Sequence, residues 1–171
     1  MEIKVTENGY KRIGEFFGRH SFMLAVLKLV YKYLPYPVFV AYPSLLVYLF
    51  FHYGIISEEF LKVLFVPAVV FVAVTLFRKI CNRQRPYEKY DIKPIVHKEK
   101  KGQSFPSRHA ASEFIIAMAF LYVSPALGIV LLFVGAVMCV SRVLCGVHFI
   151  KDVLVGAALS VLIGYIGFFL L

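Results

Sequence analysis

Two histidines and one aspartate in the second half of the chain carry the strongest chemical signal. His148 and Asp152 stand four residues apart in "SRVLCGVHFIKD", and residues four apart on a helix share a face. An aspartate one turn below a histidine can accept its Nδ1 proton, which leaves Nε2 free to attack an electrophile. A metal site is the alternative for this pair, but lysines and arginines dominate its surroundings and would repel a cation. His109 stands beside Arg108 in "FPSRHAASEF", where a lysine-rich loop gives way to a hydrophobic run.

The segment between Arg78 and Arg108 is strongly basic. It holds ten Lys or Arg residues against Glu88, Asp91 and Glu99, which makes seven of the chain's nine net positive charges. A basic run between two spans commonly marks a cytoplasmic loop. Here the arginines stand next to the ends of hydrophobic runs, so a pocket for an anion fits better, and a lipid phosphate is the anion we expect. Nucleic acid is not expected, because no aromatic stacking platform or recognised binding module accompanies the loop.

Hydrophobic runs that could cross a bilayer surround these residues. The chain has 171 residues, of which 60% are hydrophobic and only 17% are charged, and this composition predicts an integral membrane protein with an all-α fold. Four runs have the length of a span, and a fifth is shorter but gains length if its helix starts near Ser107. They are Pro37 to Tyr53, Phe60 to Phe77, Pro125 to Val140 and Val153 to Leu171, with Ala110 to Val123 as the fifth.

The stretch from His20 to Leu34 has two interpretations. Lys28 and Lys32 interrupt it, so it is either a short sixth span with snorkelling lysines or an amphipathic helix on the membrane surface. Residues 1–19 are polar and lack the apolar core and cleavage site of a removable signal peptide. We expect a single integral-membrane domain over residues 1–171, a polytopic helical bundle of six transmembrane helices with its active site at one interface.

Three polar clusters need one explanation. They are residues 78–86, 106–109 and 141–152, and they fall on one side of the membrane if consecutive spans alternate in direction. Two histidines, an orienting carboxylate and several cations together suit phosphoryl transfer through a phosphohistidine. We therefore expect a basic active-site loop over residues 78–109.

The clusters resemble the three signatures of the type 2 phosphatidic acid phosphatase superfamily, the lipid phosphate phosphatases related in active site to vanadium haloperoxidases. Those signatures are K-x6-R-P, P-S-G-H and S-R-x5-H-x3-D, and "SRVLCGVHFIKD" matches the third in full. The first is matched at Arg85 and Pro86, but Arg78 stands in the lysine position with Lys79 beside it. The second reads "PSRH", so Arg108 stands where the superfamily usually has glycine.

The resemblance implies a role for each matched residue. His148 would be the nucleophile, Asp152 its orienting carboxylate and His109 the general acid that protonates the leaving group. It implies no cofactor and no metal ion. The residues it implies for binding the phosphoryl oxygens are Arg142, Arg85, Ser107 and Arg78 or Lys79.

Two further residues have open roles. Arg108 either contacts a second phosphate, which would suit a diphosphate substrate, or points to water or lipid headgroups. Glu113, one turn after His109, either hydrogen-bonds that histidine and raises its pKa towards the acid role or serves in packing.

The resemblance implies a lipid phosphate substrate in the bilayer. The superfamily acts on phosphatidic acid, phosphatidylglycerol phosphate, lipid A phosphates and polyprenyl diphosphates, and we rank undecaprenyl diphosphate first. A non-catalytic protein that binds an anionic lipid is the alternative from another class. The superfamily usually places this site on the extracytoplasmic face of a bacterial cytoplasmic membrane, which requires six spans and a cytoplasmic N-terminus. The positive-inside rule, applied to the basic loop, indicates the opposite face.

Overall fold

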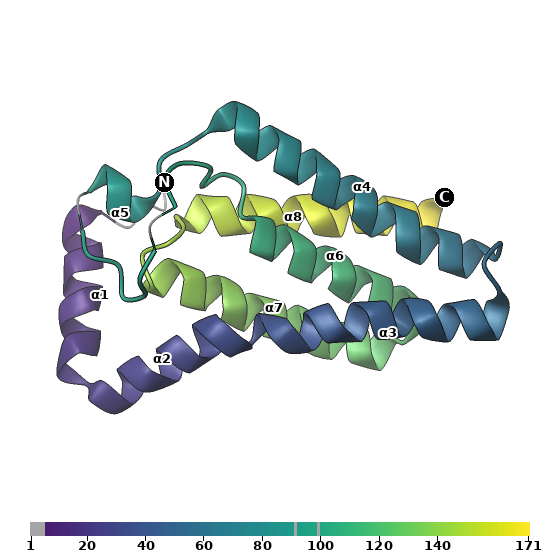
Figure 1. The fold of residues 1–171 in the computed structure, drawn as a ribbon, viewed down its shortest axis with the longest axis horizontal. Coiled ribbons are helices and arrows are strands. Elements are labelled where there is room, and N and C mark those ends of the chain that lie inside the picture. The colour runs from purple at the N-terminus through teal and green to yellow at the C-terminus, as the bar shows by residue number, and fades with distance from the viewer. Residues whose placement is uncertain (1–5, 91, 99) are drawn as a thin grey trace.

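The computed structural model of the protein describes residues 6–90, 92–98 and 100–171, and it is an all-α helical bundle (Figure 1). Short helices α1 (Glu7–Arg19) and α5 (Pro86–Lys89) lie at one end of the bundle, and α8 continues into a π-helical turn, η1 (Ile166–Leu170). The six helices that form the bundle are α2 (Ser21–Tyr33), α3 (Pro35–Tyr53), α4 (Glu58–Cys81), α6 (Arg108–Val123), α7 (Pro125–Leu144) and α8 (Ile150–Tyr165).

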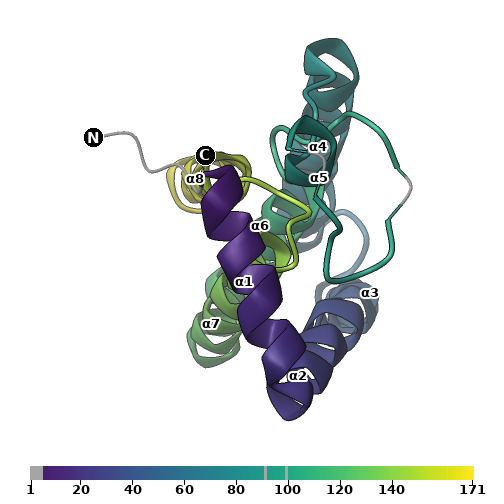
Figure 2. The ribbon, with the colours of Figure 1, turned by 90° about the vertical axis from the view of Figure 1, so that its left-hand side faces the viewer.

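Helix α6 lies inside the bundle and packs against α4, α7 and α8 (Figure 2). It begins where the sequence predicted, because the Ser107 hydroxyl caps it by accepting a hydrogen bond from the Ala110 N–H at 3.4 Å. The hydroxyl of Ser160 on α8 donates to the Ala111 carbonyl at 2.9 Å. A Cβ atom at Gly156 would lie 2.7 Å from the Ser107 carbonyl oxygen, so only glycine allows α8 to approach α6 this closely. The start of α6 is therefore held firmly against α8.

The bundle buries a continuous apolar core and also presents apolar side chains outward. Leu49, Val63, Ile115 and Phe168 are almost fully buried in one cluster that joins α3, α4, α6 and η1. Many large apolar side chains face outward, which a bilayer accommodates and water does not. The elements with the length and hydropathy of a membrane span are Ser21–Tyr53, Glu58–Lys89, Pro125–Leu144 and Ile150–Leu170. The chain is an integral membrane protein with helical spans.

Four candidate spans in the described part of the chain stand against the six expected, because α2 and α3 together form one of them and α6, with 16 residues, is shorter than a span of this kind. Leu34 keeps right-handed helical backbone angles and its N–H donates to the Val30 carbonyl, so the chain passes from α2 to α3 without reversing direction. The two helices make one candidate span of 33 residues. The stretch from His20 to Leu34 therefore belongs to this long candidate span and does not form one of its own.

The amphipathic helix at the surface is instead α1, within the polar segment 1–19. It lies across the end of the bundle that also carries α5 and the basic loop (Figures 1 and 2). Tyr10 and Phe17 are its buried residues. The expected topology needed a sixth crossing between the N-terminal segment and the site, whereas the structure has α1 and the basic loop at the same end.

Candidate active site

The three polar clusters meet at this end of the bundle around a cavity of about 130 Å³. Arg78 comes from the last turn of α4, His109 from the first turn of α6 and Arg142 from the last turn of α7, while His148 lies in the turn before α8. Because α4 and α7 end here and α6 and α8 begin here, residues far apart in sequence surround one space. The residues that line it are Tyr31, Arg78, Arg85, Lys98, Lys100, Arg108, His109, Arg142, Val147 and His148.

His148 and Asp152 lie close together, but not on one helical face as their spacing suggested. Helix α8 starts at Ile150 with Phe149 as its N-cap, so His148 precedes the helix. The Asp152 carboxylate turns back to accept the Phe149 N–H at 3.1 Å, as the acidic residue of a capping box does. This places Oδ2 of Asp152 3.6 Å from Nδ1 of His148. The cap at the start of α8 therefore creates the contact.

Ser104 connects this histidine and carboxylate. Its hydroxyl is fully buried, donates to Oδ2 of Asp152, and lies 3.4 Å from Nδ1 of His148. A hydroxyl that gives its proton to the carboxylate has its lone pairs free for the imidazole N–H. His148 thus carries its proton on Nδ1, and Nε2 is the free nitrogen.

The second oxygen of Asp152 faces Arg83. The Nη1 atom of Arg83 lies 3.4 Å from Oδ1, and its guanidinium packs over the Phe149 ring at 5.0 Å and the Phe105 ring at 5.7 Å. Both carboxylate oxygens therefore have hydrogen-bonding or charged partners, which keeps Asp152 ionised and oriented beside the imidazole.

Burial lowers the pKa of His148 to about 4, although its hydrogen bonding with Asp152 acts in the opposite direction. The positive charges of Arg85 and Arg78 contribute to this lowering of the pKa. The imidazole is consequently neutral at pH 7, which is the form that can act as a nucleophile.

Two of the cavity's arginines are held in place by carbonyl groups of the basic loop. Arg78 donates from Nη1 to the Pro106 carbonyl at 2.9 Å and from Nη2 to the Gln103 carbonyl. Arg85 donates from Nε to the Gly102 carbonyl at 3.1 Å. Cations fixed in this way need little rearrangement when an anion arrives.

The loop itself is tied down by Glu88. The carboxylate accepts the Gly102 N–H at 2.9 and 3.0 Å and the Arg85 N–H at 2.8 Å. Gly102 has a φ angle of +63°, a conformation that favours glycine, and an added Cβ would displace the side chain of Asn82. These hydrogen bonds hold Arg85, Glu88 and Gly102 together beside the cavity.

Arg142 has a buried hydrogen-bond donor that lacks a partner. It is 4% exposed, its guanidinium lies 4.2 Å from the centre of the Tyr31 ring, and its Nε has no hydrogen-bond partner among the residues that the structure describes. A buried cation of this kind is costly unless it meets an anion. The cavity is therefore suited to an anionic group at Arg142.

Asp152, which lies behind His148, and three further expected residues do not line the cavity. Lys79 is exposed on α4, so Arg78 is the cation from that helix. Ser107 is buried at the start of α6, where its N–H donates to the Asp152 backbone carbonyl at 2.8 Å. Glu113 is buried deeper along α6, and its Oε1 has no hydrogen-bond partner in the described part of the chain. A supporting role of Glu113 for His109 stays a prediction.

Sequence reasoning missed several residues of the site. Ser104 and Arg83 lie within the predicted active-site loop, so their position in the sequence could have marked them as candidate site residues. Tyr31 comes from α2, far from every signature, and no pattern pointed to it. Tyr10 of α1 donates from its hydroxyl to the His148 carbonyl at 3.3 Å, so the N-terminal helix also braces the site.

The structure is a helical membrane bundle with arginines and two histidines around one cavity and an aspartate paired with one histidine, an arrangement typical of a membrane phosphatase. Residues 59–170, more than half of the chain, match the model of the PAP2 superfamily. The chain belongs to the PAP2 superfamily, and it is a PAP2-type lipid phosphatase, a metal-independent phosphoester hydrolase.

Two solved structures share the fold. LpxE of Aquifex aeolicus has a TM-score of 0.72 and 22% sequence identity, with 98% of this chain and 95% of that chain covered. The first transmembrane PAP2 type phosphatidylglycerolphosphate phosphatase from Bacillus subtilis has a TM-score of 0.52 and 23% identity, with 94% and 74% covered. A comparison with curated protein sequences gave no match.

Proposed function

We propose that the chain hydrolyses a phosphomonoester or diphosphate of a membrane lipid through a phosphohistidine at His148. The observation that carries this proposal is the placement of a buried, neutral His148 in one cavity with three arginines, Arg78, Arg85 and Arg142. Nucleophile and phosphate-binding cations thus converge in a volume of about 130 Å³.

In the first step, Nε2 of His148 attacks phosphorus and the bond from phosphorus to the leaving oxygen breaks. His109, as the imidazolium that forms beside the bound phosphate dianion, donates its proton to that oxygen and becomes neutral, so the lipid leaves as an alcohol or, from a diphosphate, as a lipid monophosphate. In the second step a water molecule gives a proton to His109 and attacks phosphorus, which releases inorganic phosphate and restores both histidines.

The developing charge on the phosphoryl oxygens is stabilised by groups fixed before the reaction. The guanidinium groups of Arg78 and Arg85 are held by loop carbonyls, and Arg142 brings an unpaired Nε. The N-terminus of α6, capped by Ser107, adds a positive partial charge near His109.

Undecaprenyl diphosphate is the substrate we rank first, because Arg108 offers a cation for a second phosphate. Its side chain is exposed where it lines the cavity, and it replaces the usual glycine of the signature. Phosphatidylglycerol phosphate, phosphatidic acid and lipid A phosphates are the alternatives. The similar structure from Bacillus subtilis carries the name of a phosphatidylglycerolphosphate phosphatase.

We place the site on the extracytoplasmic face together with α1, which lies at the same end of the bundle, so this proposal replaces the cytoplasmic N-terminus of the expected topology. Phosphate binding accounts for the arginines of the basic loop, so their charge does not require a cytoplasmic position. Cys81 is exposed at the site end of α4 and serves as a reporter. A membrane-impermeant maleimide should label Cys81 in intact cells, whereas labelling only after permeabilisation would put the site in the cytoplasm.

The function is tested with purified protein in detergent and a chelator, using a panel of the four lipid classes. Phosphate release from at least one of them by the wild-type protein and none by His148→Ala is the expected result. Turnover by His148→Ala, or lipid binding without turnover by the wild-type protein, would contradict the proposal.

A further inference from the structure

A path of cavities leads from the phosphate site into the membrane-facing side of the bundle. A space of about 260 Å³ shares Arg108 and His109 with the phosphate cavity. Its remaining lining residues are Phe39 on α3, Phe71 on α4 and Ser112 on α6. The phosphate cavity therefore continues sideways between three helices.

The path then opens into an apolar groove of about 320 Å³ between α3, α4 and α6. The groove shares Phe39, Phe71 and Ser112 with the space before it, so the three cavities follow one another without a gap in their linings. Leu46 and Ala68 lie further along. We call this last part the tail groove; its lining residues are Phe39, Tyr42, Leu46, Leu64, Pro67, Ala68, Phe71, Ser112, Ile115 and Ile116.

The chemistry along the path changes from cationic to apolar at one residue. The guanidinium of Arg108 lies 5.7 Å from the centre of the Phe71 ring, so the last cation of the phosphate site packs on the first aromatic side chain of the groove. Phe39 and Phe71 are 47% and 45% exposed, so part of each side chain remains open to contact. This order of charge followed by apolar surface matches an amphiphile with a phosphate at its head.

We propose that the hydrocarbon tail of the lipid substrate lies in the tail groove, running from Arg108 past Phe39 and Phe71 to Ala68. The proposal rests on the proposed function, since it names where the substrate of that same site binds. A tail in this position holds the phosphorus atom at the cavity, and the contacts contribute to binding in proportion to the apolar area they cover.

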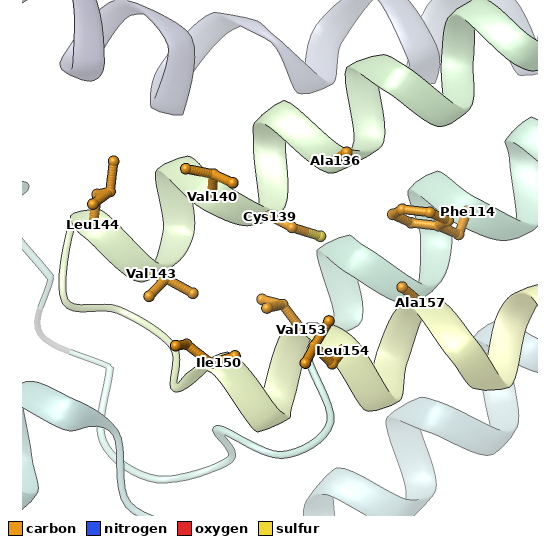
Figure 3. Close-up of a pocket in the computed structure, with 10 residues that line it drawn as sticks. All are labelled: Phe114, Ala136, Cys139, Val140, Val143, Leu144, Ile150, Val153, Leu154 and Ala157. Atoms are coloured by element: carbon orange, nitrogen blue, oxygen red, sulfur yellow. The ribbon is translucent and has the colours of Figure 1, made fainter. Parts of the chain in front are cut away.

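A second apolar groove provides a comparison on the same molecule. It lies between α6, α7 and α8, has a volume of about 450 Å³, and receives side chains such as Phe114, Cys139 and Leu154 (Figure 3). It is larger than the tail groove, but none of its lining residues also lines the phosphate cavity. Size alone would favour this groove, whereas continuity with the site favours the tail groove.

Two matched substitutions separate the grooves. Ala68 in the tail groove and Ala136 in the groove of Figure 3 are both exposed alanines on a transmembrane helix, so Ala68→Phe and Ala136→Phe each fill one groove. The substrates are undecaprenyl diphosphate and dioleoyl phosphatidic acid, with 4-nitrophenyl phosphate as a substrate that has no tail. Ala68→Phe should lower kcat/KM for the hydrolysed long-chain lipid about tenfold or more and leave 4-nitrophenyl phosphate hydrolysis unchanged. Ala136→Phe should leave both unchanged.

The outcomes test the tail-groove proposal separately from the proposed phosphatase function. A tail-dependent loss in Ala136→Phe, or an equal loss on both substrates in Ala68→Phe, would overturn the proposal. If the wild-type protein hydrolyses no substrate, the proposed function fails, and the groove is decided by photo-crosslinking with phosphatidic acid that carries a diazirine in its acyl chain. Labels on α3, α4 and α6 that unlabelled phosphatidic acid displaces support the tail groove, whereas labels on α7 and α8 or labels without displacement contradict it.

Discussion

The hydroxyl oxygen of Ser104 lies 3.4 Å from Nδ1 of His148, between that nitrogen and the carboxylate of Asp152 to which the hydroxyl donates. The chain of hydrogen bonds runs from the imidazole to the hydroxyl and from the hydroxyl to the carboxylate. It assigns the Nδ1 tautomer to His148 and directs Nε2 away from the carboxylate. Ser104 is in this account a positioning residue for the nucleophile.

Ser104→Ala should lower kcat about 10- to 100-fold, by analogy with the loss of a hydrogen-bond partner that orients a metal-bound histidine, with little change in KM. Ser160→Ala is the matched control, because Ser160 is equally buried and donates to a backbone carbonyl, that of Ala111, between α8 and α6. It should lose stability and keep its kcat. Steady-state kinetics on both variants decide the point, and a Ser104→Ala protein with full kcat would remove Ser104 from the mechanism.

The first signature left open whether Arg78 or Lys79 binds phosphate, and the structure separates them. Arg78 lines the cavity and is 6% exposed, whereas Lys79 is exposed on α4 and does not line the cavity. Arg78→Gln should lower kcat/KM about 100-fold, since a charge-assisted contact to the phosphoryl group is lost. Lys79→Gln should stay within about twofold of the wild-type protein, because an exposed charge contributes little. The reverse order of effects would assign the cation to Lys79.

The stability of the protein should depend on pH through His148. Burial lowers its pKa from 6.5 to about 4, so between these values the unfolded chain binds a proton at this position and the folded chain does not. The free energy of unfolding therefore falls as the pH drops from 6.5 to 4, by about 3 kcal/mol at most from this group.

The comparison protein for this measurement is His148→Gln, in which the same acidic groups remain and only the imidazole is gone. Thermal unfolding in detergent should show a smaller loss of midpoint between pH 6.5 and 4 for the variant than for the wild-type protein. Identical losses in the two proteins would show that the imidazole is not buried in its neutral form.

Replacing each of the two histidines should have a different effect on activity. A lipid alkoxide needs a proton to leave, whereas the phenolate of an activated aryl phosphate leaves largely unaided, so His109→Ala should be partly rescued by 4-nitrophenyl phosphate. The rescue should recover part of a loss of about 10²- to 10⁴-fold. His148→Ala should show no rescue, because both substrates need the covalent step. Equal residual activity of both variants on both substrates would mean that the roles are assigned wrongly.

The sequence predicted the polar part of the site better than the path of the chain around it. The third signature brought His148, Asp152 and Arg142 together, yet the reason for the contact of the first two is a helix cap rather than a shared helical face. Spacing alone does not reveal where a helix begins, and the turn at Gly146, with a φ angle of +72°, delays α8 until Ile150.

The number of membrane spans shows a second limit of prediction from sequence. Lys28 and Lys32 made the stretch before Pro35 look like a separate segment, and a proline at a helix start commonly marks a break. Leu34 nevertheless keeps helical angles, so α2 continues into α3 and carries Tyr31 to the cavity, where its ring packs on Arg142. Such a contact between distant segments depends on the packing of the whole bundle and leaves no local pattern.

The central claim is that phosphate becomes bonded to His148, and trapping that bond tests it most directly. In His109→Ala the activated aryl phosphate still phosphorylates His148, but the water that should release the phosphate lacks its base, so the intermediate should accumulate. Quenching in alkali, which preserves phosphohistidine, followed by mass spectrometry of the peptide around His148 is the measurement. The account predicts one phosphate on His148 in His109→Ala and none in the protein that also carries His148→Ala. Turnover of the aryl phosphate with no phosphate on His148, or phosphate bonded to another residue, would contradict it.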